Sequence, residues 1–557
     1  MALKLQARIQ AALAKAVKDA AICRGWDIKA LPSVELEVPR EKAHGDLATN
    51  VAMQLAREAK LPPRAVAEEI IRYLDTSGTH IETAEVAGPG FINLRLGNDW
   101  LYEVLRDIED QGASYGSSDV GGGKRVMLEF VSANPVGPMN VVNARAAAVG
   151  DTLANIMQAA GYDVGREYYV NDAGRQAYLF GLSLLARYKE LAGVDGEFPE
   201  DGYPAPYVTE LAEVMRQEVP DLLQKPQGEQ EAFCKKWGTD QMVNQQKADL
   251  AAFGVEFDVW FRERDLHSAN KLQEVIDFLE AEGLLYEQDG ARWFASTRFG
   301  DDKDRVVVKS DGVPTYITAD MAYHWDKYRR GFDHLIDIWG PDHHGYIGRM
   351  QAAIQALGYE ADSFEVVILQ LVNLLRRGEK VRMSKRAGEF VSMTELLEEV
   401  GKDAARYFFL MRAPDSHLDF DLALAAEESQ ENPVYYIQYA HARICSILRQ
   451  AEESSIQCPS AYDADVHLLQ AEQELDLIKK LAQLPEEVIL AAERRGPHHI
   501  ARYCHELASS FHSFYTHCRV LGEDEALQGA RLVLLQSTGK VLKIALGLLG
   551  VSAPERM

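Results

Sequence analysis

A chain of 557 residues is too long for a single hydrophobic core, so its length predicts about three or four domains. Hydrophobic residues make up 47% of the chain and charged residues 26%, as in ordinary globular proteins, and no apolar run approaches the roughly 18 residues that a membrane span requires. The net charge of −26 disfavours nucleic acid as a partner, but residues 376–386 (RRGEKVRMSKR) carry six basic side chains against one acid and predict a local phosphate-binding loop. We therefore expect a cytoplasmic protein without DNA or membrane partners.

The first part of the chain, residues 1–112, mixes helical and β-like segments and predicts an α+β domain. Helices are expected over 3–22 and 63–74, and strands over 33–38 and 91–96. The first helix is Ala-rich and basic, like a transit peptide, but Asp19 and the continuous pattern favour an ordinary helix of the fold. A glycine- and serine-rich stretch at 114–124 predicts a domain boundary. The six cysteines are scattered, so we expect free thiols and no zinc site.

Residues 125–170 predict a strand, turn, helix and strand in that order. The apolar segment 125–131 is typical of a buried parallel strand, an Ala-rich helix follows over 143–160, and 163–170 is the second strand. The N-terminus of such a helix offers unpaired backbone N–H groups to an anion. Glu129 lies inside the first strand and needs a cation there, which is either a substrate cation or an internal basic side chain.

A third strand is expected at LIDIW (335–339), directly before GPDHHG (340–345). Because ligands bind at the carboxyl ends of parallel strands, this turn is a candidate binding site. Its two histidines could instead hold a metal ion, but adjacent histidines in one turn rarely converge on one ion. A helical insertion is expected over 185–265, and beyond about residue 395 amphipathic helices replace strands.

Six motifs in this order resemble those of bacterial arginyl-tRNA synthetases, which are class I aminoacyl-tRNA synthetases. They are EFVSANPVGP (129–138), GYDVGREYYVNDAGRQ (161–176), GPDHHGYIGRM (340–350), VRMSKRAGEFV (381–391), DAARYFFLMRAPDSHLDFDL (403–422) and ENPVYYIQYAHARI (431–444). The resemblance implies an α/β fold: a Rossmann-type parallel-sheet catalytic domain with an α+β N-terminal domain and an all-α C-terminal domain. The implied limits are 1–112 for a tRNA-elbow-binding domain, 113–395 for the catalytic domain, 396–430 for a connecting segment and 431–557 for an anticodon-binding domain.

The implied reaction joins L-arginine to tRNA(Arg) at the expense of ATP, with Mg²⁺ carried by ATP and no structural metal, in a monomer. The resemblance implies arginine contacts at Glu129, Ser132, Asn134, Tyr316, Asp320 and His344. It implies ATP contacts at Pro138, Asn140, Val142, Asn143, Gly340, Asp342, His343, Met383, Ser384 and Lys385, with Lys385, Asn140 and Asn143 as catalytic residues. Tyr435, Tyr436, Tyr439, His441 and Arg443 mix aromatic faces with cations, which suits the unstacked bases of an anticodon loop, and Tyr435, Tyr439 and Arg443 are the expected tRNA contacts among them. The resemblance adds Asn50, Phe91 and Asn93 as candidates in the N-terminal domain. Each tyrosine could equally belong to a buried helix face.

Residues 140–143 depart from the family, which has His-Val-Gly-His where this chain has Asn-Val-Val-Asn. An Asn amide can donate to phosphate but is never cationic, and the Val142 side chain would occupy space used by adenine. A shifted helix or a tilted adenine would remove that conflict. We expect a slower but active synthetase. The rival hypotheses are a protein that binds tRNA or arginine without forming adenylate, and a ligase that attaches arginine to another acceptor.

Overall fold

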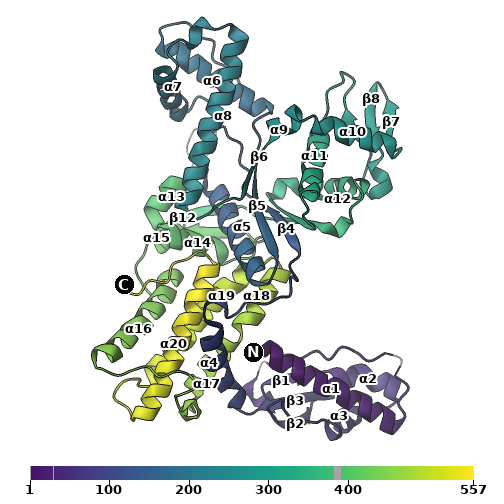
Figure 1. Cartoon of the computed structure of the whole chain (residues 1–557), viewed down its shortest axis with the longest axis vertical. Coiled ribbons are helices and arrows are strands. Elements are labelled where there is room, and N and C mark those ends of the chain that lie inside the picture. Colours follow the sequence, from purple (N-terminus) through teal and green to yellow (C-terminus); the bar gives the residue numbers. More distant parts are fainter. Residues whose placement is uncertain (1, 29, 40, 382–390) are drawn as a thin grey trace.

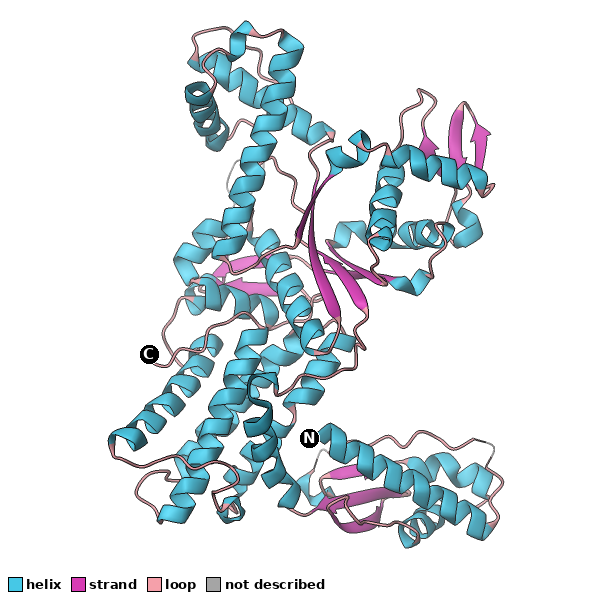
Figure 2. Ribbon diagram, viewed as in Figure 1, coloured by secondary structure: helices cyan, strands magenta, loops and turns pink. Residues whose placement is uncertain are grey.

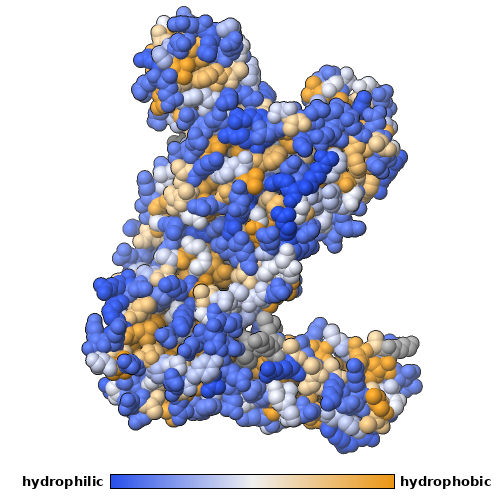
Figure 3. Space-filling view, in the orientation of Figure 1, coloured by the Kyte–Doolittle hydropathy of each residue, from blue (hydrophilic) through white to orange (hydrophobic). Residues whose placement is uncertain are grey.

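The computed structural model describes the whole chain except residues 1, 29, 40 and 382–390. A small N-terminal α+β unit, a central parallel sheet and a bundle of helices follow one another along the chain (Figure 1). No described helix is both long enough and apolar enough to cross a membrane. The face shown in Figure 3 is largely hydrophilic, with apolar side chains in scattered groups.

The N-terminal unit contains a three-stranded antiparallel sheet in the order β1-β3-β2, next to its helices. Its elements are α1 (Ala2–Arg24), β1 (Leu47–Thr49), α2 (Val51–Ala59), α3 (Pro63–Arg72), β2 (Ile81–Ala87), β3 (Phe91–Leu96) and α4 (Asp99–Gln111). The long first helix is part of the fold, because Ile9, Leu13 and Val17 are buried in the core. The strand expected over 33–38 is wrong: only Glu37 makes a bridge, to Ala48 of β1, because that segment lacks a continuous strand partner.

The central sheet has five parallel strands in the order β11-β10-β4-β5-β6, and the first helix after β4 is α5 (Figure 2). The bounds are β4 (Arg125–Glu129), α5 (Val141–Ala159), β5 (Asp163–Val170), β6 (Val259–Arg262), β10 (His334–Trp339) and β11 (Phe364–Ile368). These confirm the expected strands near 125–131, 163–170 and 335–339 and the helix between the first two. Apolar, nearly continuous sequences form these strands because both faces of the sheet are covered.

Two insertions interrupt the sheet. Between β5 and β6 the chain forms α6 (Arg175–Leu191), α7 (Pro206–Glu218) and α8 (Gln227–Ala252), which build a separate apolar cluster around Phe180 and Leu184. Between β6 and β10 it forms α9 (Glu263–Ser268), α10 (Lys271–Ala281), the antiparallel strands β7 (Leu285–Gln288), β8 (Ala291–Phe294) and β9 (Arg305–Val308), and α11 (Tyr316–Arg329). Helix α12 (Ile347–Ala356) follows β10.

The remaining chain is mainly helical. It contains β12 (Val372–Arg376), β13 (Glu379–Lys380), α13 (Met393–Val400), α14 (Lys402–Leu410), β14 (Leu418–Asp421), α15 (Leu422–Ala425), α16 (Pro433–Glu453), α17 (Glu472–Ala482), α18 (Leu484–Glu493), α19 (His498–His517) and α20 (Glu525–Leu548). Strand β14 was not expected beyond residue 395; it pairs parallel with β12. The domain limits inferred from the sequence stay predictions.

Candidate active site and tRNA interface

The carboxyl ends of the central strands meet at one edge of the sheet. Glu129 of β4 lies beside Asp337 of β10 and Glu167 of β5 in the strand register. The turns that follow β4 and β10 therefore begin at the same edge, where parallel sheets bind ligands. These are the two turns in which the sequence places most arginine and ATP contacts.

The turn after β4 has a strained backbone. Val131 and Ser132 have φ values of 68° and 41°, a left-handed conformation that is rare for residues other than glycine and an outlier for valine. This bend directs the Ser132 hydroxyl to Glu129, where it donates to Oε1 over 2.9 Å, and the Ser132 hydroxyl oxygen in turn accepts the Tyr169 backbone N–H over 3.1 Å. Asn134 lies farther out and is exposed, and its amide donates to Gln176 over 2.8 Å.

Glu129 has an internal cation. The Lys327 ammonium donates to Glu129 Oε2 over 2.6 Å and to Asp337 Oδ1 over 3.1 Å, and Lys327 is fully buried. Burial raises the pKa of Glu129, and the charge of Lys327 opposes that rise. The internal ion pair, which the sequence left as an alternative, is therefore present.

Tyr316 and Asp320 lie one turn apart in α11, so the expectation that they share a helix face is confirmed. Tyr316 is 73% exposed, whereas the Asp320 carboxylate accepts a hydrogen bond from the Tyr346 hydroxyl at the start of α12. Burial raises the pKa of Asp320, and the Tyr346 hydroxyl opposes that rise. A cationic ligand group would suit this acid.

Glu263 is a second buried acid near Asp320, and the sequence analysis missed it. It is the first residue of α9, directly after β6, and burial together with the charges of Asp320 and Asp172 raises its pKa to about 7. Its position resembles that of Glu129, since Glu129 ends β4 and Glu263 directly follows β6 of the same sheet. The signal in the sequence that could have identified Glu263 is its place as an acid directly after the segment WFR (260–262).

The substituted residues 140–143 form the cap of α5. The Asn140 side-chain oxygen accepts the backbone N–H groups of Val142 (2.9 Å) and Asn143 (3.3 Å), and the Asn143 side-chain oxygen accepts the Asn140 N–H over 3.0 Å. This reciprocal arrangement is a capping box, and it corrects the expectation of unpaired backbone donors at this helix start. The Val142 side chain is 40% exposed, and Pro138 is half-buried.

The turn after β10 is a short 3₁₀ helix over Pro341–Tyr346 that begins after Gly340. Asp342, His343 and His344 are all exposed, and the only ion pair among them is His343 with Asp342, 3.5 Å apart within this described turn. Met383, Ser384 and Lys385 lie outside the described residues. The chain just beyond them contacts the α5 cap, because the Met393 N–H donates to the Met139 carbonyl over 2.9 Å and Ser392 bridges Asn140.

The aromatic residues of α16 form a half-buried stack. The rings of Tyr435 and Tyr439 are 6.4 Å apart and nearly parallel, and the Arg443 guanidinium lies over the rings of Tyr439 and Tyr515. Tyr436 is half-buried as well, whereas His441 is buried and its Nδ1 donates to the Pro554 carbonyl over 2.9 Å. His441 is therefore a core residue, and the expectation that it offers a face to tRNA is wrong.

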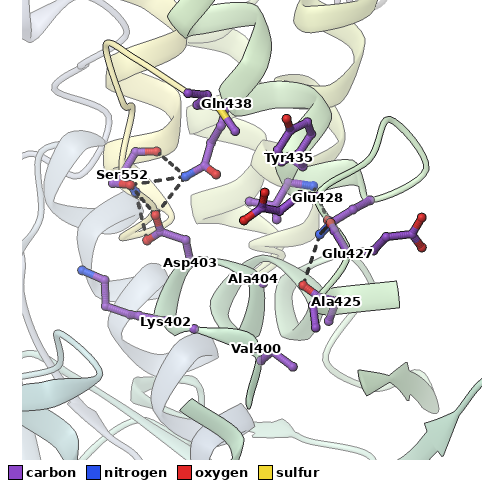
Figure 4. A pocket seen from close by; sticks show the side chains of 15 residues that line it. Val400, Lys402, Asp403, Ala404, Ala425, Glu427, Glu428, Tyr435, Gln438 and Ser552 are labelled. Carbon is purple, nitrogen blue, oxygen red and sulfur yellow. Dashed lines mark hydrogen bonds between the residues drawn. The ribbon is translucent and has the colours of Figure 1, made fainter. Parts of the chain in front are cut away.

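Tyr435 also lines a cavity of about 460 Å³ between α14, α16 and the C-terminal segment (Figure 4). Gln438 projects into the same region and donates to Asp403 over 2.9 Å and to the Ser552 carbonyl over 3.0 Å. Glu427 and Glu428 stand on the opposite side (Figure 4). The C-terminal segment thus fastens α16 to α14.

The N-terminal candidates lie on the small sheet. Thr49 of β1 pairs with Ile92 of β3, and Asn50 and Phe91 are the residues next to this pair in the sequence. Phe91 and Asn93 are half-buried and alternate with the buried Ile92 and Leu94, so they share the more open face of β3. The structure therefore places Asn50 near the two β3 candidates, far along the chain from α16 (Figure 1).

Three family profiles match the chain. "Arginyl tRNA synthetase N terminal domain" matches residues 4–96, "tRNA synthetases class I (R), catalytic domain" matches 108–412, and "DALR anticodon binding domain" matches 437–557. Together they span the α+β unit, the parallel sheet with its insertions and the helical bundle.

Relatives match along the whole length. "Arginine--tRNA ligase" of Symbiobacterium thermophilum is 50% identical over 554 residues, covering 100% of this chain and 99% of the relative, and that of Geobacillus kaustophilus is 52% identical over 532 residues, covering 95% of both. The solved Thermus thermophilus arginyl-tRNA synthetase shares the fold, with a TM-score of 0.75 at 24% identity over 99% of this chain and all of that one. The chain belongs to the arginyl-tRNA synthetase family of class I ATP-dependent aminoacyl-tRNA ligases.

Proposed function

We propose that this chain attaches L-arginine to tRNA(Arg) in two steps. The arginine carboxylate attacks the α-phosphorus of Mg²⁺-bound ATP, which forms arginyl-adenylate and releases pyrophosphate. A hydroxyl of the 3′-terminal ribose of tRNA then attacks the arginyl carbonyl, and AMP leaves. Because the side chains form no covalent intermediate, they contribute by positioning the reactants and stabilising charge.

The buried acids at the sheet edge divide arginine recognition between them. Glu129, with Ser132 and Asn134, receives the α-ammonium and carboxylate end, while Asp320 receives the guanidinium, aided by Tyr316 and His344. Glu263 adds a second acid on the guanidinium side, and its raised pKa marks a carboxyl that gains from a nearby cation. A planar guanidinium presents five donors in a rigid fork, so it can face two carboxylates at once.

The α5 cap and the basic loop hold ATP. Both Asn140 and Asn143 use their amide oxygens for the cap, and within the described part of the chain neither amide nitrogen donates to another residue. These two NH₂ groups are therefore available to phosphate oxygens. Pro138, Val142, Gly340, Asp342 and His343 surround the adenosine, and Lys385, with Met383 and Ser384, stabilises the charge of the leaving pyrophosphate.

Transfer RNA contacts both ends of the molecule. Tyr435, Tyr439 and Arg443 offer aromatic faces and a cation to unstacked anticodon bases, and Asn50 and Phe91 contact the tRNA elbow. Residues 1–112 and 431–557 are the corresponding binding domains, and the synthetase acts as a monomer.

The observation that carries this proposal is the convergence of buried acids and the α5 start at one sheet edge. The test is charging of tRNA(Arg) with labelled arginine and ATP, with lysine as the control amino acid. We expect arginyl-tRNA with arginine alone, and pyrophosphate exchange that requires arginine. Binding of arginine or tRNA without either product would identify a non-catalytic binding protein, and arginine transfer to a different acceptor would identify another ligase.

A further inference from the structure

Helix α11 carries a row of buried polar side chains behind the residues that are proposed to bind arginine. Asp320, His324 and Lys327 follow one another at helical spacing, and both His324 and Lys327 are buried. Charged side chains are rarely buried without partners. The partners of this row lie on the adjacent strands β4 and β10.

Asp337 of β10 joins the two basic residues. Its Oδ1 accepts from Lys327 over 3.1 Å, and its Oδ2 lies 2.9 Å from His324 Nε2. His324 Nδ1 lies 2.8 Å from the Asp320 backbone carbonyl, which can only accept, so this ring nitrogen carries a proton. Lys327 also lies over the Tyr323 ring, 4.2 Å from its centroid. The ammonium thus has a fixed position.

Lys327 and Ser132 together fix both carboxylate oxygens of Glu129. Lys327 holds Oε2 at 2.6 Å, and the Ser132 hydroxyl holds Oε1 at 2.9 Å. Since Lys327 is fully buried, it has no surface to offer a substrate and can act on one only through Glu129. Among the described residues, Glu129, His324 and Asp337 also lie close enough together to share a metal ion, but the lysine already bridges two of them.

We propose that Lys327, anchored by Asp337, is a positioning residue that fixes Glu129 for the α-ammonium of arginine. The inference rests on the proposed function, in which Glu129 receives that group. Lys327 keeps Glu129 ionised and in one rotamer, so that the carboxylate is already oriented when arginine enters. Its removal weakens arginine binding without affecting the ATP turn, which lies beyond β4 at the start of α5.

The test is a double-mutant cycle on KM for arginine, measured by tRNA charging with Lys327→Met, Glu129→Gln and the double variant. We expect Lys327→Met to raise KM for arginine by about tenfold or more, because it frees the carboxylate of Glu129, while KM for ATP stays within about twofold. In the Glu129→Gln background the same change should raise KM for arginine by less than about twofold, since Lys327 acts through Glu129.

Asp337→Asn provides a second variant that preserves the side-chain shape, in case Lys327→Met does not fold. It releases the anchor of Lys327 and should raise KM for arginine by about threefold or more, again without a change in KM for ATP. Glu474→Gln is the matched control, because it breaks the buried Glu474–Arg531 pair (2.7 Å) in the helical bundle. We expect it to lower the unfolding temperature and leave KM for arginine unchanged.

Three results would overturn the proposal: additive effects in the cycle, equal changes in KM for arginine and ATP, or an unchanged KM for arginine in the folded variants. A parent chain that charges no tRNA would instead refute the proposed function. A parent that charges tRNA while the folded variants keep its KM for arginine would refute only the role of Lys327.

Discussion

The two sides of the candidate active site are built differently. On the side proposed to bind arginine, Glu129, Asp320 and Glu263 are withdrawn from solvent and tied to neighbouring side chains, and their pKa values are raised by burial. On the nucleotide side, the start of α5 carries the exposed Val142 and two asparagines whose oxygens complete a helix cap. The arginine side depends on tertiary contacts, whereas the nucleotide side depends on local backbone hydrogen bonds.

This difference shows how the family signature can change without loss of the helix. A cap requires only a suitable acceptor at its first position, and Asn is among the best residues for it. A buried acid cannot be exchanged so freely, because its partners are left unpaired. Exchange of one capping residue for another should therefore preserve the start of α5, whereas substitution among the acids should be costly.

Asp320→Asn should have the largest effect. Loss of the carboxylate removes a charged partner of the guanidinium, and truncation of such pairs costs about 2–5 kcal/mol. We expect kcat/KM for arginine to fall by about 10³, as measured by tRNA charging, with an unaltered unfolding temperature. A loss below tenfold would mean that Asp320 does not contact the substrate.

Restoring the family signature should raise activity, whereas Asp320→Asn lowers it. The triple variant Asn140→His, Val142→Gly and Asn143→His regains imidazole donors and space for adenine, so adenylate formation should become faster by about tenfold, measured by pyrophosphate exchange. The same variant loses the capping box and should unfold at a lower temperature. An unchanged rate would show that the asparagine turn binds ATP as well as the histidine one.

The two proposed roles of Asn140, capping α5 and donating a hydrogen bond to phosphate, can be tested separately. Asn140→Ala removes the cap and should lower the free energy of unfolding by about 1 kcal/mol, whereas Asn140→Asp retains an acceptor and should keep it. Asp has no NH₂ group, so both variants should raise KM for ATP by severalfold. A normal KM for ATP in Asn140→Asp would exclude the amide nitrogen as a phosphate donor.

Glu263 should produce the smallest effect, a pH dependence. Its pKa of about 7 means that the carboxyl is protonated below neutrality, so KM for arginine should fall as the pH rises from about 6 to 8. The raised pKa also means that its contribution to folding stability is present at low pH and lost as the pH rises through about 7. Glu263→Gln should flatten both profiles by comparison with the parent. Identical pH profiles would show that another group titrates.

Much of the central sheet could be predicted from the sequence, because β4, β5 and β10 are apolar segments bounded by turn residues. The segment 33–38 has the same local pattern but meets only one residue of β1, and a strand exists only where a partner strand is available. Strand β14 was missed because its sequence, LDFD, is too short to predict a strand. It forms because β12 is available as a parallel partner.

The candidate site divides in the same way. The cap was not predicted, because the helix was expected to begin at residue 143 with unpaired N–H groups, although an Asn at the helix start and another three residues later were the available signal. Lys327 offered no such signal, because it lies 198 residues from Glu129 and reaches it only once α11 packs on the sheet. The buried position of His441 likewise depends on the C-terminal segment, since its partner is the Pro554 carbonyl.

The bend at Val131 and Ser132 lowers the free energy of unfolding of the whole protein. Left-handed backbone at residues with a Cβ atom costs about 1–3 kcal/mol each, and glycine at position 131 would relieve much of it. The same change would remove the Val131 side chain, which packs against the main core, and would hold the Ser132 hydroxyl less firmly against Glu129. The bend therefore places the Ser132 hydroxyl against Glu129 at the expense of an unfavourable backbone conformation.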